Sequence, residues 1–192
     1  MIFIPEADER VVLVDRDDNE IGTARKLEVH RTGELHRAFS VFVMNSRGEM
    51  LLQQRALGKY HTAGLWSNTS CGHPRPGEPV GVAAARRLEE EMGFTCALDR
   101  CYGFVYEVHL GSDLSEHEYD HVLVGKYDGI PVPDETEVRA WKWERPRKIM
   151  EDIQVRGHMY TPWFRIALPY LLDGNGTLKP EFDPGSASES FR

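Results

Sequence analysis

The stretch that decides the fold is GHPRPGEPVGVAAARRLEEEMGF, residues 72–94. It begins as a loop rich in glycine and proline, and apolar residues then recur at helical spacing over residues 79–92. Gly93 follows at the position that favours a C-terminal helix cap, so we predict a helix that ends there. Glu90 and Glu91 lie on this predicted helix, where a carboxylate can hold a hard cation such as Mg2+ against a diphosphate.

The charged residues of this stretch resemble the Nudix box, whose pattern is G-x5-E-x7-R-E-U-x-E-E-x-G-U. The matching positions are Gly72, Glu78, Arg86, Glu90, Glu91 and Gly93. The resemblance implies an α/β (α+β) Nudix fold, in which a mixed β-sheet is sandwiched between helices. Taken alone, residues 89–91 are more simply a solvated helix face, but agreement over the whole spacing favours a cation site.

One position departs from that pattern, because Arg87 stands where the box has a glutamate. Nudix hydrolases rely on an acidic cluster for metal-assisted attack of water on a diphosphate, and a cation in the cluster removes ligand charge from it. Arg87 therefore weakens a hydrolase interpretation. An arginine at this position can instead contact a diphosphate bidentately.

Composition and charge narrow the class of protein. The chain has 192 residues, of which 41% are hydrophobic and 28% charged, and this is typical of a globular protein. We expect one domain over residues 1–172 and a mobile tail over residues 173–192, which are rich in glycine, proline and serine. The formal net charge of −8 argues against a general nucleic-acid binder, because such binding needs cations to neutralise phosphates.

Three further observations bear on the compartment and on partners. No run of the sequence approaches the roughly 18 to 20 apolar residues of a membrane helix, and the start, MIFIPEADER, lacks the layout of a signal peptide. We therefore expect a cytoplasmic protein without a membrane partner. The three cysteines form no CxxC pair, which argues against a disulfide framework or a zinc ribbon. Nothing in the sequence sets the oligomeric state.

Apolar runs separated by turn residues predict the sheet. The runs that we expect to be strands are residues 11–14, 38–44, 50–54, 101–109 and 121–124. Turn residues at 45–48 predict an antiparallel hairpin between the second and third of these strands. Two further helices are expected at residues 145–154 and 162–172, each with a proline near its start, where proline is tolerated.

Motifs outside the box resemble a narrower family. These motifs are WSNTSCGHP at residues 66–74, HRTGELHRAFS at residues 30–40 and EHE at residues 116–118. Together they resemble the type I isopentenyl-diphosphate isomerases over residues 11–172, and three motifs in the right order make the likeness specific. The resemblance implies that isopentenyl diphosphate is converted to dimethylallyl diphosphate, a step of isoprenoid biosynthesis.

That isomerisation needs one group to protonate an alkene and another to remove a neighbouring proton, with a tertiary carbocation between them. The resemblance assigns these roles to Cys71 and Glu118, with Tyr106 assisting the glutamate and the Trp163 ring facing the cation. A lone cysteine is more often a small buried apolar residue. Cys71 differs because it adjoins a phosphate-type loop, whereas Cys96 and Cys101 have no such setting.

A metal site is also implied. Glu116 and Glu118 are two residues apart, so on a strand both point to one face, as two carboxylates that share a metal must. The resemblance completes a His3Glu2 set with His30, His36 and His73. Imidazole and carboxylate ligands suit Mn2+, Mg2+, Zn2+ or iron. A separate Mg2+ is expected to bridge the substrate diphosphate and Glu91.

The diphosphate needs positive partners. The resemblance assigns this task to Lys26, Arg55, Lys59 and Arg87. Each of them alone is more simply a surface charge, because the chain has 23 lysines and arginines. Their joint match is what favours a binding role.

Two other functions stay open at this stage. One is a Nudix hydrolase that cleaves a nucleoside diphosphate derivative, since one fold hosts many reactions. The other is a non-catalytic module that binds a phosphorylated ligand. Arguments against the hydrolase are Arg87 in place of an acid, Cys71, and the set of His30, His36, Glu116 and Glu118. A binding module would not need an acid/base pair, whereas Cys71 and Glu118 are both present.

Overall fold

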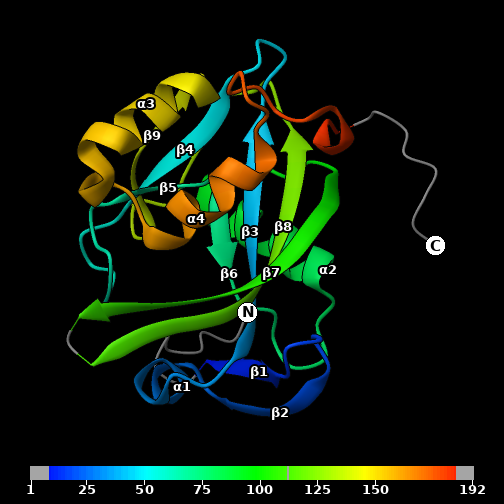
Figure 1. The fold of residues 1–192 in the computed structure, drawn as a ribbon, viewed down its shortest axis with the longest axis vertical. Coiled ribbons are helices and arrows are strands. Elements are labelled where there is room, and N and C mark those ends of the chain that lie inside the picture. The colour runs from blue at the N-terminus through cyan, green and yellow to red at the C-terminus, as the bar shows by residue number, and fades with distance from the viewer. Residues whose placement is uncertain (1–8, 112, 185–192) are drawn as a thin grey trace.

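The computed structural model describes residues 9–111 and 113–184. Within them the strands form one mixed sheet, and the helices lie on both of its faces (Figure 1). The strands are β1 (Arg10–Val14), β2 (Glu20–Arg25), β3 (His36–Met44), β4 (Met50–Arg55), β5 (Trp66–Ser67), β6 (Ser70–Gly72), β7 (Leu98–Gly111), β8 (Leu114–Lys126) and β9 (Val138–Glu144). The helices are α1 (Lys26–Thr32), α2 (Val80–Met92), α3 (Pro146–Arg156) and α4 (Pro162–Leu171), with short 3-10 turns at Gly157–Met159 and Pro180–Phe182.

β3 is the central strand. It pairs in parallel with β8 along its whole length, from His36↔Glu118 to Met44↔Lys126, and antiparallel with β6 on the other side. All but one of its residues are buried, as a strand covered on both faces requires. β7 and β8 form a long antiparallel hairpin, so that β6, β3, β8 and β7 lie side by side and present one continuous face.

The predicted hairpin between residues 38–44 and 50–54 is confirmed only at its base, where Met44 pairs with Met50. Beyond that pair the prediction was wrong, because β4 turns away from β3 and pairs with β9. The Thr69 hydroxyl fills the gap between the strands. Its oxygen accepts a hydrogen bond from the Val43 amide (2.9 Å) and donates to the Leu51 carbonyl (2.8 Å). One side chain thus replaces the ladder bonds that the diverging strands lose.

The three predicted helices are confirmed as α2, α3 and α4. α2 ends at Gly93, whose φ of 72° is the left-handed conformation that glycine adopts without strain. Pro146 and Pro162 occupy the first turns of α3 and α4, where the missing N–H removes no helical hydrogen bond. The helix α1 and the strands β2, β5, β6 and β9 were not predicted, because they are short or only half-buried and carry little periodicity.

Two hydrophobic clusters hold the layers together. α2 packs Leu88 and Met92 against β3 residues of one parity, such as Val41. α4 packs Phe164 and Leu168 against residues of the other parity, such as Phe42. Alternate residues of β3 therefore serve opposite cores, which fixes its register because a slip of one residue would exchange the two faces.

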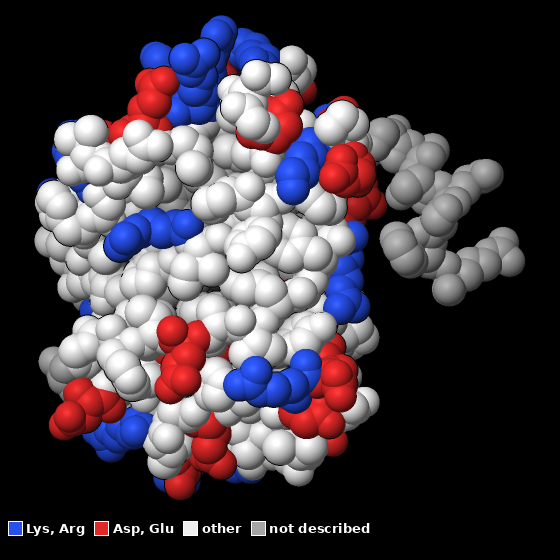
Figure 2. Space-filling view, in the orientation of Figure 1, with Lys and Arg blue, Asp and Glu red and all other residues white. Residues whose placement is uncertain are grey.

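The region after α4 turns back on the fold. Leu172 pairs with Leu178, and the Phe182 ring lies 5.7 Å from that of Tyr102 on β7. The rest of the predicted tail, residues 185–192, lies outside the described residues. Figure 2 shows the face that carries α4 and β7: its middle is mostly uncharged, and charged residues gather toward its two ends. Among the described residues no helix is long and apolar enough to span a membrane.

The Thr69 bridge yields a stability prediction. Thr69→Val keeps the shape of the side chain but leaves the buried Val43 amide and Leu51 carbonyl without their partner. We expect the free energy of unfolding, measured in urea, to fall by about 1 to 3 kcal/mol. Thr69→Ser, which keeps the hydroxyl, should recover most of that loss. Equal stability of Thr69→Val and the wild type would show that the bridge does not hold the diverging strands.

Candidate metal and acid/base site

The structure brings the five residues predicted to share a metal into one buried cluster. Each offers one donor atom, and these atoms all lie within 4.8 Å of one another. The residues are His30 from α1, His36 at the start of β3, His73 just after β6, and Glu116 and Glu118 from β8. All five are at least nine-tenths buried.

Local geometry explains how residues far apart in the sequence meet. α1 ends at Gly33 with φ 72°, and this reversal brings His30 and His36 to ring centroids 5.1 Å apart. His36 pairs with Glu118 across β3 and β8. Glu116 is two residues earlier on β8, so it points to the same face as Glu118. The sheet register therefore sets most of the cluster.

The donor atoms fit a cation. The Nδ1–H of His36 donates to the Glu34 carbonyl (2.9 Å), which leaves a lone pair on Nε2 in the neutral ring. That Nε2 lies 3.2 Å from Nε2 of His73, which in turn lies 2.9 Å from Oε1 of Glu118, so the ligand atoms of three residues lie close together. Nε2 of His30 and Oε2 of Glu116 are also buried without a hydrogen-bond partner among the described residues. A divalent metal would satisfy all of these atoms, so the set is compatible with one.

Electrostatics agree with that fit. Burial, together with the neighbouring His73 and His36, lowers the pKa of His30 to about 2, so the ring is neutral as a ligand must be. Burial and the charge of Glu118 raise the pKa of Glu116 well above its ordinary value. Burial opposes ionisation of Glu118 as well, but the neighbouring His36 and His73 rings outweigh it and lower its pKa.

The predicted acid/base residues lie beside the cluster on the same face of the sheet. The Tyr106 hydroxyl donates to Oε2 of Glu118 at 2.6 Å, and the two residues are paired across β7 and β8. Cys71 pairs with Ser40 across β6 and β3, so it flanks β3 on the side opposite to Glu118. Burial of the Cys71 thiol raises its pKa to about 12, so it keeps its proton at neutral pH.

Trp163 closes the site from α4. Its side chain is 4% exposed, and its Nε1–H donates to the Ser67 hydroxyl at 3.0 Å. The Arg55 guanidinium lies 5.5 Å from the centre of its ring. Trp163 belongs to the same hydrophobic cluster as Tyr106 and Cys71, so the indole lines the apolar part of the site.

Two of the four residues predicted to bind the diphosphate are Lys26, at the start of α1, and Arg55, at the end of β4. Lys26 forms an ion pair with Glu9 at 3.1 Å. Arg55 is 8% exposed, and its Nε has no hydrogen-bond partner among the described residues. The positive charge of Arg55 opposes the effect of burial on the pKa of the Cys71 thiol.

The other two cations, Lys59 and Arg87, converge on one carboxylate. Oε2 of Glu137 accepts from Nζ of Lys59 (2.8 Å) and from Nη2 of Arg87 (3.0 Å). The stem of Arg87 passes over Gly72, where a Cβ would meet it at 3.6 Å. Arg87 therefore lies next to the backbone of Cys71, and the two cations are held side by side at the edge of the site.

Glu91, predicted to bind Mg2+, is engaged within the protein. Its Oε2 accepts from the Gln53 amide (2.7 Å), and its Oε1 accepts from Nη2 of Arg87 (2.6 Å). The carboxylate is 4% exposed and acts on the Cys71 thiol electrostatically. It is near enough to share the site, and Oε2 accepts one hydrogen bond, from Gln53, where a carboxylate oxygen can accept two.

The sequence analysis missed four residues of the site. Asp120 is 1% exposed, accepts from Ser40 (2.8 Å), and has one buried oxygen without a partner among the described residues. It follows Glu118 by two positions, so strand alternation alone could have found it. The others are Tyr60, His61 and Glu137, and nothing in their spacing indicates a role.

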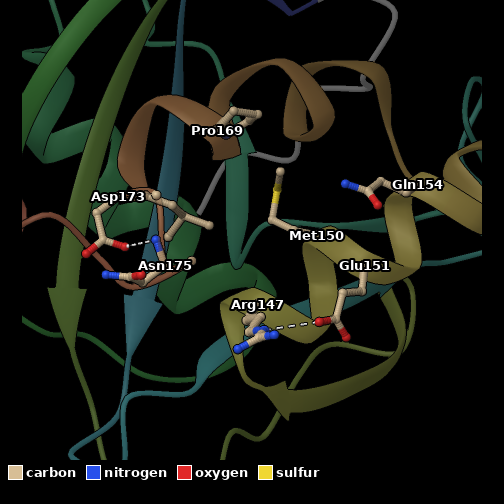
Figure 3. Close-up of a pocket in the computed structure, with 10 residues that line it drawn as sticks. Arg147, Met150, Glu151, Gln154, Pro169, Asp173 and Asn175 are labelled. Carbon is tan, nitrogen blue, oxygen red and sulfur yellow. Dashed lines mark hydrogen bonds and ion pairs between the residues drawn. The ribbon is translucent and has the colours of Figure 1, made fainter.

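A separate surface pocket lies away from this cluster. Figure 3 shows it between α3, the end of α4 and the following loop, with an Arg147–Glu151 ion pair on its wall. No residue predicted for the site lines it. The predicted residues therefore gather in the buried cluster and not in this open hollow.

Comparison with known proteins gives the same picture. The NUDIX domain matches residues 34–164. The chain is 49% identical to the isopentenyl-diphosphate Delta-isomerase of Burkholderia multivorans over 85% of this chain and 96% of that protein. It is 48% identical to isopentenyl-diphosphate Delta-isomerase 1 of Aromatoleum aromaticum, over 84% and 91% of the two chains.

Solved structures are similar in fold at much lower identity. DR0079 from Deinococcus radiodurans superposes with a TM-score of 0.72 at 18% identity, over 84% of this chain and 98% of that one. A MutT NUDIX hydrolase from Burkholderia pseudomallei gives a TM-score of 0.55 at 22% identity, over 71% and 97%. The predicted Nudix fold, with its mixed sheet between helices, is thereby confirmed.

Glu116 provides a test of the metal cluster. Its folded pKa is raised above the ordinary 4.5, so its contribution to stability is present at acid pH and is lost as the pH rises above about 4.5. Glu116→Gln mimics the neutral form. Without metal at neutral pH we expect the variant to be more stable than the wild type by roughly 1 to 3 kcal/mol, because a buried charge is removed. Urea unfolding should show this gain shrinking toward acid pH.

Added Mn2+ should make the wild type more stable than Glu116→Gln. Mn2+ at a hundred times its dissociation constant should stabilise the wild type by about 2.7 kcal/mol and the variant by much less, because the variant lacks a charged ligand. Glu135→Gln, at an exposed glutamate, is the matched control and should respond to Mn2+ as the wild type does. If Mn2+ stabilised Glu116→Gln as strongly as the wild type, Glu116 would not be a ligand.

Proposed function

This chain belongs to the NUDIX family and, within it, to the isopentenyl-diphosphate Delta-isomerases, and from that premise we propose that it interconverts isopentenyl and dimethylallyl diphosphate in isoprenoid biosynthesis. The observation that carries the proposal is the shared sheet face of Cys71, Glu118 and Tyr106 beside a buried His3Glu2 cluster. Hydrolysis of a diphosphate does not need such a combination.

The protonation states suit a reaction that adds one proton and removes another. The Cys71 thiol holds a proton at neutral pH, whereas Glu118 is ionised. In the proposed reaction one of the two groups gives a proton to the terminal alkene carbon, which leaves a tertiary carbocation. The other removes a proton from the methylene carbon on the far side of the cationic carbon. The double bond therefore moves by one position, and the proton count is unchanged.

Tyr106 and Trp163 would support that pair. The hydrogen bond from Tyr106 to Glu118 holds one carboxylate oxygen in place and stabilises its charge. The Trp163 ring, fixed by its bond to Ser67, offers a π face to the carbocation. A cation over an indole gains roughly 2 kcal/mol when water is excluded, and the 4% exposure of Trp163 supports such exclusion.

Mn2+ or another divalent metal would be held by His30, His36, His73, Glu116 and Glu118. When bound, it would supply a local positive charge that orients Glu118 and lowers its affinity for a proton. Glu91 would hold a second cation, Mg2+, which would supply positive charge for the substrate diphosphate, since magnesium prefers carboxylate and phosphate oxygens.

The substrate diphosphate would exchange partners with internal carboxylates. Lys59 and Arg87 are already held side by side by Glu137, so a diphosphate entering there meets a prepared pair of cations. Arg55, whose Nε is buried without a partner among the described residues, would donate to the same anion. Lys26 would approach from the β2–α1 junction. The planar guanidinium of Arg87 would bind a phosphate bidentately.

The direct test is an assay of the purified protein with isopentenyl diphosphate, Mg2+ and Mn2+ in deuterated water. We expect proton NMR to show dimethylallyl diphosphate carrying deuterium and phosphorus NMR to show the diphosphate intact. Release of phosphate without isomerisation would instead favour a hydrolase. Tight binding of the substrate without any turnover would favour the binding module.

Two substitutions test the acid/base pair. Cys71→Ala and Glu118→Gln should each lower kcat by about 100-fold or more, because each removes a proton-transfer group, while circular dichroism shows that each variant keeps its fold. Cys101→Ala, at a cysteine outside the site, is the matched control and should retain turnover. Wild-type kcat in either site variant would contradict the roles proposed here.

A further inference from the structure

The loop between β4 and β5 touches the metal cluster through two consecutive residues. Tyr60 and His61 lie on this loop, and their side chains reach different members of the cluster. Neither residue is a member of the His3Glu2 set. What they contact is the outer side of two of its ligands, His30 and Glu116.

Tyr60 contacts the ring nitrogen of His30 that faces away from the cluster. Its hydroxyl oxygen lies 2.7 Å from Nδ1 of His30, while Nε2 of the same ring points to Oε2 of Glu116 at 3.3 Å. If the Tyr60 oxygen accepts the Nδ1 proton, the lone pair is on Nε2, where a metal ligand needs it. With the Tyr60 oxygen as acceptor, the contact holds His30 in the tautomer whose Nε2 can bind a metal.

His61 contacts Glu116 and orients its carboxylate. Its Nε2 lies 3.2 Å from Oε1 of Glu116, the oxygen that is not directed at His30. The other ring nitrogen, Nδ1, lies 3.1 Å from the Thr62 hydroxyl. With the hydroxyl donating to Nδ1, the proton of the neutral ring is on Nε2 and is given to Oε1. The second oxygen of Glu116 is thereby left free to face the cluster.

The loop is held firmly enough to impose these contacts. Its ends are joined by backbone hydrogen bonds between Arg55 and Leu65 (2.9 Å) and between Gly64 and Arg55 (3.1 Å). The His61 ring is packed edge-on between Tyr60 at 4.3 Å and Trp163 at 6.0 Å. It is about nine-tenths buried. Lys59, which precedes Tyr60, donates to Glu137 next to β9.

We propose that Tyr60 and His61 are positioning residues for the metal, with Tyr60 fixing the tautomer of His30 and His61 fixing the orientation of Glu116. This inference rests on the metal site of the proposed function and is independent of the reaction carried out there. Outer partners of this kind typically change metal affinity by about 10- to 100-fold. One short segment would then have two roles. Lys59 would bind the substrate diphosphate, and Tyr60 and His61 would position two ligands of the metal.

The experiment measures metal binding without substrate. The full chain is titrated with Mn2+ in competition with a chromophoric chelator, and the dissociation constant is compared among variants. Tyr60→Phe, which removes only the hydroxyl, and His61→Leu should each weaken Mn2+ binding by about 10- to 100-fold. His61→Gln, whose amide can still donate to Glu116, should recover much of the affinity, which a loss of packing alone would not explain.

Matched controls separate this role from general effects. Tyr170→Phe and His158→Gln change exposed residues outside the cluster and should leave Mn2+ affinity unchanged. Thermal unfolding without metal identifies any variant that has lost its fold, and Tyr60→Phe alone then carries the test. Wild-type Mn2+ affinity in both Tyr60→Phe and His61→Leu would overturn the inference. Absence of isomerase activity in the wild type, with the affinity losses present, would refute the proposed function and leave this inference standing.

Discussion

The structure depends on burying two carboxylates close together. Donor oxygens of Glu116 and Glu118 lie within 4.8 Å of each other, and both side chains are withdrawn from water. Two like charges at that distance repel by about 3 to 4 kcal/mol at an effective dielectric constant of 20. This is a large part of the roughly 5 to 15 kcal/mol by which a domain is stable. The fold must therefore supply compensating groups on every side of the pair.

Those groups explain the arrangement of the surrounding elements. Three imidazoles face the carboxylates, and Tyr106 donates to the oxygen of Glu118 that they leave open. Cations lie further out beside carboxylates: Lys59 and Arg87 share Glu137, and Lys26 forms an ion pair with Glu9. Although the net charge of the protein is −8, positive side chains gather around this site and can bind an anionic substrate. Their carboxylate partners balance the positive charge when no substrate is bound. The apolar cluster around Trp163 excludes water from the rest.

Features that follow from local rules, such as helical periodicity and strand alternation, could be predicted from the sequence. The helix over residues 80–92 and its glycine cap follow from periodicity and from the conformational freedom of Gly93. The common direction of Glu116 and Glu118 follows from strand alternation. The same alternation reaches Asp120, which was overlooked because no motif contains it. The predicted hairpin failed beyond its turn because Thr69, distant in sequence, offers both strands a competing partner.

The sequence by itself determined the family, the Nudix-type layers and the set of side chains able to carry acid/base and metal chemistry, because motif spacing and residue type are local properties of the chain. Only the tertiary structure decided which atoms of those side chains face one another. The parallel register of β3 and β8 sets His36 beside Glu118, and the β4–β5 loop sets Tyr60 and His61 behind His30 and Glu116. These contacts join residues 30 to 82 positions apart. They depend on backbone register and loop path, which no spacing along the chain encodes.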